Sequence, residues 1–362
     1  MNRETITDKQ SIYLIIMFLL GASIIILRGG EAKQDLWLAT ILAILGALVV
    51  CLICARLHYI FPHNTLFDII DICFGKFIGR LLSLMYIFFT FILTSLLIMD
   101  FGYFFTTVTF PETPKIIFNI LSTIVGAYAV KSGIEVIARW AKAFLPLLIL
   151  VIATFLFLLI QEMNIDNIYP LLSNKASSII KGAFSAFSFP FGEIIVFTMV
   201  FYNFHTRKSP YKVYTTGLLI SGMFVLILSN AYILALGIDT AIGTYFPAYL
   251  AASRISIGMV LERTEIVVAI IFSIATFAKL CICLLATCIG TSKILGFNDY
   301  RFIVMPISLM MVNVSYSLFD SIMDWFEWTM AIWPYFAFIF QVILPIIILI
   351  AAEIKKEALK II

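Results

Sequence analysis

Long apolar stretches without charge follow one another along this chain, and they constrain its fold more than any other feature. Several run for about 18 residues or more, the length that a helix needs to cross a hydrocarbon core of about 30 Å. Hydrophobic residues make up 62% of the 362 residues and charged residues 12%, whereas soluble chains average about 45–50% and about 25%. The sequence therefore predicts an all-α integral membrane protein and excludes a soluble fold.

We expect ten membrane-spanning helices in a single transmembrane domain over residues 1–362. Thr7 to Gln10 has the pattern of a capping box at the start of the first helix. This first stretch lacks a convincing cleavage site and resembles the stretches that follow, so we interpret it as a span and not as a signal peptide. The predicted spans are residues 11–27, 36–57, 81–107, 115–131, 141–161, 181–203, 213–236, 265–290, 302–319 and 330–352.

The basic residues fall unequally on the two sides of this topology. The side that holds both termini carries sixteen of the 24 lysines and arginines, the other side carries seven, and Lys279 lies within a span. Because cytoplasmic loops are enriched in Lys and Arg, we expect both termini in the cytoplasm. The net charge of +3 is thus a topology signal, and nothing in it indicates a nucleic-acid partner.

Ten spans divide into two repeats of five, the first over about 11–161 and the second over about 181–352. Because five is an odd number, the second repeat starts on the opposite side of the membrane and is expected to be inverted relative to the first. Inverted repeats with discontinuous helices at matching positions indicate a binding site near the bilayer midplane. The matching helices are spans one and six. Span six contains Phe189, Pro190, Phe191, Gly192 and Glu193, and span one contains Gly21, Ala22 and Ser23.

Each of these breaks also has a simpler interpretation. A proline can kink a packing helix without forming a site, and small residues are common at membrane helix contacts. The central position of Glu193 favours a site, because a carboxyl group at that depth must be paired, hydrated or protonated. We therefore expect the residues of both breaks to contact a ligand.

Two further charged residues, Lys279 and Asp100, are predicted within the membrane. With Glu193 they are candidates for ion or proton coupling, and a structural ion pair is the alternative. The segment 245–263 after span seven is rich in apolar residues, so we expect an outer connector helix there. Glu262 and Arg263 at its end are candidate gate residues, although a connector without a gating role fits equally well.

The sequence offers little for catalysis. The six cysteines are best explained as small packing residues, and the three histidines are predicted near the cytoplasmic ends of spans. No nucleophile–base pair, metal-ligand cluster or nucleotide-binding glycine loop stands out. We therefore expect neither an enzyme nor a bound cofactor or metal.

Several motifs resemble the spore germination permease-like family, the B subunits of germinant receptors in spore-forming bacteria. The motifs are Thr7-Asp8-Lys9-Gln10, Phe189-Pro190-Phe191-Gly192-Glu193, and Ser256-Ile257-Gly258 with Glu262-Arg263-Thr264-Glu265. The resemblance covers nearly the whole chain, and the second and third of these motifs are its most specific parts.

This family is related to the amino acid/polyamine/organocation transporters, so the resemblance implies a LeuT-like fold in which helices one, three, six and eight surround the ligand. Gly21–Ser23 and Phe189–Glu193 would then present backbone groups to it. The resemblance further implies a larger A subunit and a lipoprotein C subunit as partners, in the spore inner membrane. The family pattern does not account for Lys279.

Two functions follow. The chain is either a sensor that binds a small germinant, by default an L-amino acid, and signals to partner subunits, or a proton-coupled amino acid transporter. The family resemblance favours the sensor, whereas the residues alone favour uptake. The sequence leaves open which germinant binds, whether ions pass, and what Lys279 pairs with.

Overall fold

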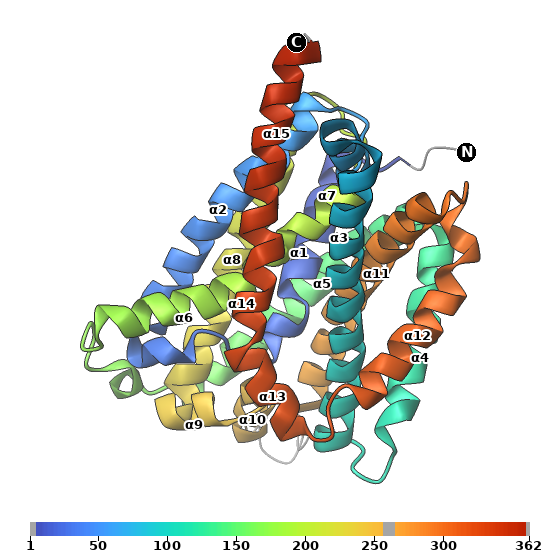
Figure 1. The fold of residues 1–362 in the computed structure, drawn as a ribbon. Coiled ribbons are helices and arrows are strands. Elements are labelled where there is room, and N and C mark those ends of the chain that lie inside the picture. Colours follow the sequence, from blue (N-terminus) through green and yellow to red (C-terminus); the bar gives the residue numbers. More distant parts are fainter. Residues whose placement is uncertain (1–4, 256–264, 360–362) are drawn as a thin grey trace.

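The computed structural model describes residues 5–255 and 265–359, and within these ranges every regular element is a helix. The helices form one bundle, with both described chain ends at the same end of it (Figure 1). The elements in order are α1 (Asp8–Leu20), η1 (Ala22–Ile24), η2 (Gly30–Asp35), α2 (Leu36–Ile60), α3 (Leu66–Val108), α4 (Lys115–Ser132), α5 (Ile134–Leu159), η3 (Ile160–Glu162), η4 (Ile165–Ile168), α6 (Ala176–Ser188), η5 (Phe191–Val196), α7 (Phe197–Val200), α8 (Ser209–Leu236), α9 (Ile238–Gly243), α10 (Pro247–Arg254), α11 (Glu265–Leu295), η6 (Tyr300–Phe302), α12 (Val304–Ser317), α13 (Ile322–Ala331), α14 (Trp333–Phe338), η7 (Ile339–Ile343) and α15 (Leu344–Leu359).

All ten predicted spans correspond to helical segments of this bundle. Seven of the described helical segments are long and apolar enough to cross a membrane, and the apolar α12 is shorter. Span one is interrupted between α1 and η1, and span six is divided into α6, η5 and α7. The two helices predicted to be broken are therefore both broken. Span ten combines α14, the π-helical turn η7 and α15.

Helix starts follow the capping chemistry of the sequence. Thr7 and Gln10 form the predicted capping box, with the Thr7 amide 2.9 Å from the Gln10 side-chain oxygen. Thr65 and Asp68 form a second capping box at the start of α3. In both boxes the side chains bind backbone amides that have no partner within the helix.

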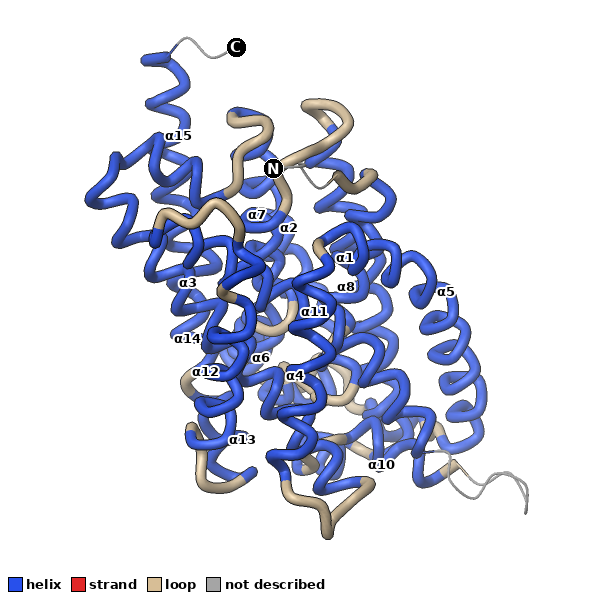
Figure 2. The backbone as a smooth tube through the Cα atoms, turned by 90° about the vertical axis from the view of Figure 1, so that its right-hand side faces the viewer, coloured by secondary structure: helices blue, strands red, loops and turns tan. Residues whose placement is uncertain are grey.

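Burial separates a central layer from a lipid-facing periphery. In the most apolar window of the span that contains α6 and α7, 89% of residues are buried, compared with 28% in α5. Figure 2 shows α5 at the margin of the bundle. A membrane helix that is buried all round has little contact with lipid, so its polar residues must be accommodated by other protein groups.

The outer connector predicted over 245–263 is described only in part. The short helices α9 and α10 lie at the end of the bundle opposite the termini (Figure 1), and α10 ends at Arg254. The candidate gate residues Glu262 and Arg263 lie outside the described residues, so their role remains a prediction.

Candidate functional site

The first break lies at Gly21, between α1 and η1. Its backbone angles (φ 10°, ψ −129°) are not helical. A Cβ atom on Gly21 would lie 2.9 Å from the Cδ of Lys279 and 2.8 Å from the carbonyl oxygen of Phe18. Both separations are too short for a real contact, so the lysine side chain passes where any other residue would place a side chain. Gly21 therefore brings the backbone of α1 against α11.

The second break lies between Ser188, the last residue of α6, and the start of η5. Pro190 cannot donate a backbone hydrogen bond, so the helix cannot continue through it. A Cβ atom on Gly192 would lie 2.7 Å from the Cδ of Gln341. This close approach seats Gln341, from the π-helical turn η7, against the opened backbone.

Side chains bind several of the carbonyl oxygens that the breaks expose. The Ser23 hydroxyl lies 2.7 Å from the carbonyl oxygens of both Leu19 and Leu20. Gln341 Nε2 donates to the Ser188 carbonyl at 2.9 Å. Because unpaired backbone groups are costly in a membrane interior, these contacts stabilise the open backbone.

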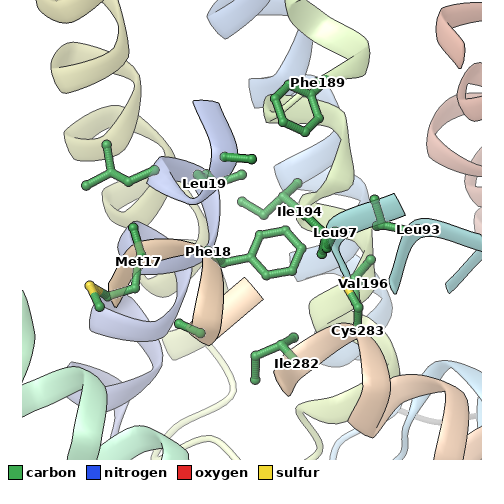
Figure 3. Packing of buried hydrophobic residues seen from close by; sticks show 14 of the residues in the cluster. Met17, Phe18, Leu19, Leu93, Leu97, Phe189, Ile194, Val196, Ile282 and Cys283 are labelled. Atoms are coloured by element: carbon green, nitrogen blue, oxygen red, sulfur yellow. The ribbon is translucent and has the colours of Figure 1, made fainter. Parts of the chain in front are cut away.

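Lys279 of α11 and Glu193 of η5 meet between the two breaks as an ion pair, and both side chains are completely buried. Neither the ammonium nor the carboxylate has a hydrogen bond to any other group in the described part of the chain. The ammonium nitrogen also lies 4.0 Å from the ring centre of Phe189 and 5.3 Å from that of Phe18, within the range of cation–π attraction. Figure 3 shows the Phe18 ring among side chains of α3, η5 and α11.

Arg28 and Asp100 form a second group of buried charges on the side of the site away from the termini. Both line one small cavity with Phe189, and their side chains are nearly buried. Arg28 Nη1 donates to the Thr329 carbonyl oxygen at 2.6 Å, and its guanidinium lies 5.1 Å from the Phe189 ring centre. A second cavity, lined by Ser23, Arg28, Phe189 and Pro190 among others, adjoins the same ring. The site thus contains two cations and two carboxylates.

Aromatic rings cover these charges toward the end of the bundle opposite the termini. The Trp325 ring lies 5.7 Å from that of Tyr103 and 6.4 Å from that of Phe246, and the rings of Tyr245 and Phe326 lie 5.1 Å apart. With the Arg28–Thr329 hydrogen bond, these contacts join α13 to α3, the connector and span one. Among the described residues, α13 is therefore the element that links the other three at this end.

The structure brings most of the predicted site residues together. Gly21, Phe189 and Glu193 contact Lys279, and Ser23, Pro190 and Phe191 line the second cavity beside the Phe189 ring. Asp100 shares the first cavity with Arg28. Two residues were missed. Arg28 falls in the loop between the first two predicted spans and was not among the predicted site residues. Gln341 is a polar residue in an apolar span, and only the fold reveals its partner. No cluster of His, Cys, Asp and Glu suited to a metal ion occurs among the described residues.

The comparisons with solved structures show the fold class. The chain matches Mhp1, a nucleobase-cation-symport-1 family transporter in a closed conformation with bromovinylhydantoin bound, with a TM-score of 0.64 and 13% identity over 90% of this chain and 75% of that one. It matches MhsT in complex with L-phenylalanine with a TM-score of 0.69 and 13% identity over 96% and 98% of the two chains. The protein is therefore an integral membrane protein of the LeuT-like transporter fold.

The sequence comparisons show the family within that class. The profile described as spore germination protein matches residues 5–324. Spore germination protein KB of Bacillus subtilis (strain 168) is 28% identical over 99% of this chain and 97% of its own length. Spore germination protein YndE of the same strain is 23% identical over 80% and 81%. The chain belongs to the spore germination protein family, as the motifs indicated.

Proposed function

We propose that this chain is the B subunit of a germinant receptor, which binds a small germinant between its two broken helices and signals to partner subunits. The observation that carries the proposal is the buried Glu193–Lys279 pair at the meeting point of the breaks. A purely structural pair would be expected to gain further hydrogen bonds from its surroundings, and this pair has none from the described residues.

The charges favour a zwitterion, and an L-amino acid is the simplest one. Its carboxylate can pair with Lys279 and its ammonium group with Glu193, so that no buried charge is left without a partner during the exchange. The backbone of Gly21–Ser23 and Phe189–Glu193 provides further polar groups. The structural neighbour MhsT, in complex with L-phenylalanine, supports this choice of ligand class.

Arg28 and Asp100 would link ligand binding to the closure of the outer end. Arg28 contacts the Phe189 ring and holds the Thr329 carbonyl, so a ligand that displaces Phe189 also changes the surroundings of Arg28. A ligand shifts a conformational equilibrium only if it binds one state more tightly. We propose that this difference moves α13, and that A and C subunits in the spore inner membrane detect the change, with both termini on the cytoplasmic side.

A proton-coupled amino acid transporter is the second candidate, and the transporter fold itself favours it. In that case Glu193, Lys279 or Asp100 would carry a proton during alternating access. A receptor and a transporter can share the same ligand site, so the two are separated by whether ligand crosses the membrane.

The experiment compares wild-type protein with Glu193→Gln, and uses Glu112→Gln on an exposed turn as the matched control. Germination of spores carrying each variant is measured alongside uptake of labelled L-amino acids by purified protein in liposomes. The receptor proposal expects Glu193→Gln alone to abolish the germination response, and wild-type liposomes to accumulate no label. Accumulation of label by the wild type, with normal germination of Glu193→Gln spores, would refute the receptor and support the transporter.

A further inference from the structure

A cavity of another kind opens at the end of the bundle where both termini lie. Its empty volume is about 500 Å³, larger than the 310 and 250 Å³ of the two cavities beside the breaks. It lies between α3 and α11, well away from the Glu193–Lys279 pair. Its lining residues are Phe67, Asp71, Lys76, Arg80, Ser83, Gly290, Lys293 and Ile294.

A fold-back of the first part of α3 creates the cavity. The helix is interrupted at Gly75, whose φ of 74° is in the region that favours glycine. The segment before it turns back so closely that a Cβ atom on Gly79 would lie 2.8 Å from a carboxylate oxygen of Asp71. Asp71 and Asp68 then reach Lys293 of α11, with oxygen–nitrogen distances of 2.9 and 2.7 Å.

The charges in the cavity do not cancel. Lys293 is paired with the two carboxylates, which leaves one negative charge in excess, so that with Lys76 and Arg80 the five groups carry a net charge of +1. Lys76 and Arg80 are exposed, and neither has an ion pair or hydrogen bond with another group that the structure describes. The Ser83 hydroxyl likewise has no partner within residues 5–255 and 265–359. The cavity therefore offers two free cations and a hydroxyl to an anion.

An apolar stripe runs beside these groups on the same helix. Lys76, Arg80 and Ser83 recur at helical spacing on one face of α3, and the residue after each lies on the neighbouring face. Those residues are Phe77, Leu81 and Leu84, with exposed fractions of 88%, 58% and 51%. Arg80 directly precedes the predicted membrane span, so the cations lie at the level of the lipid headgroups and the stripe continues into the acyl region.

We propose that this cavity binds the phosphate headgroup of an anionic phospholipid in the leaflet on the side of the termini. Lys76 and Arg80 pair with the phosphate, Ser83 donates a hydrogen bond, and an acyl chain lies along Phe77, Leu81 and Leu84. The apolar stripe favours a lipid over a free phosphate ion, because only a lipid has an acyl chain that can pack against the stripe. Basic pockets at this level of membrane proteins suit anionic headgroups.

Binding is measured by native mass spectrometry of the full-length protein in neutral detergent, titrated with phosphatidylglycerol or phosphatidylcholine. A thermal-unfolding series with inorganic phosphate and with an acidic peptide runs beside it. The test variant is Lys76→Gln/Arg80→Gln. The control, Arg139→Gln/Lys142→Gln, removes two exposed cations at the same end of the bundle.

We expect phosphatidylglycerol to bind the test variant roughly 30-fold more weakly than the wild type, the effect of two interfacial cations. The control should bind as the wild type does, phosphatidylcholine should bind weakly to all three, and Arg80→Lys should retain most of the affinity. Equal loss in control and test variants would refute a specific site. Stabilisation by inorganic phosphate or the acidic peptide, lost in the test variant, without a preference for phosphatidylglycerol would refute the lipid.

Discussion

Replacing either member of the buried Glu193–Lys279 pair leaves the other as an unpaired charge in the centre of the bundle. Lys279→Met leaves a carboxylate, and Glu193→Gln leaves an ammonium group, each in surroundings with no exposure to solvent. Breaking a buried ion pair from one side typically destabilises a protein by about 3–5 kcal/mol. In Glu193→Gln, the attraction of the remaining Lys279 ammonium to the ring faces of Phe18 and Phe189 offsets only part of this destabilisation.

The least costly response to a lone buried charge is to neutralise it, and the free energy of that protonation or deprotonation sets the size of the expected loss of stability. Protonating a glutamate at pH 7 costs about 3.7 kcal/mol, because its reference pKa in water is about 4.3. Deprotonating a lysine at pH 7 costs about 4.6 kcal/mol, because its reference pKa in water is about 10.4. We therefore expect the free energy of unfolding at pH 7 to fall by about 4 kcal/mol in Lys279→Met and by about 4–5 kcal/mol in Glu193→Gln.

The two variants should respond to pH in opposite directions. In Lys279→Met the folded state holds one more proton than the unfolded state, so its stability rises as pH falls, and the loss shrinks to about 1 kcal/mol at pH 5. In Glu193→Gln the folded state holds one proton fewer, so its stability rises with pH, and the loss falls to about 2 kcal/mol at pH 9.

Equilibrium unfolding in mixed micelles between pH 5 and 9 measures these free energies. Lys293→Met is the matched control, since it removes the same residue type from an ion pair of the same helix that is about a third exposed, and should lose only about 0–1 kcal/mol. The double variant Glu193→Gln/Lys279→Met should recover most of the stability, because it leaves no lone charge. Single variants that lose under 1 kcal/mol, or that share one pH trend, would refute this account of the pair.

Three further substitutions test the surroundings of the pair. Gly21→Val should destabilise the protein by about 1–3 kcal/mol and abolish the germination response, because its side chain would collide with Lys279; an unchanged unfolding midpoint would contradict this. Gln341→Leu should cost about 1–3 kcal/mol in the same unfolding assay by leaving the Ser188 carbonyl without its partner, whereas Gln341→Glu, which keeps an acceptor but no donor at neutral pH, should do no better. Arg28→Gln should speed hydrogen exchange in α13, whose backbone carbonyl it binds, and unchanged exchange would show that this contact does not close the outer end.

The sequence by itself determined the class of fold and the location of the breaks. Apolar stretches of membrane length leave only helices as spanning elements, since each helix satisfies its own backbone hydrogen bonds. Pro190 and Gly192 near the centre of an apolar span, with Glu193 beside them, identify a break from local chemistry alone. The number of spans follows from the same local information, and so does the family.

The tertiary structure alone decided which distant groups meet. Lys279 lies 86 positions beyond Glu193 in the sequence, and only the packing of α11 against both breaks turns two intramembrane charges into a pair. The roles of Gln341 and Arg28 and the cavity beside Lys76 likewise could not be predicted from the sequence, because each depends on contacts between segments far apart in the chain. Hydropathy and helix-breaking residues act within one helix, whereas a site is made where several helices converge, and that is set by packing.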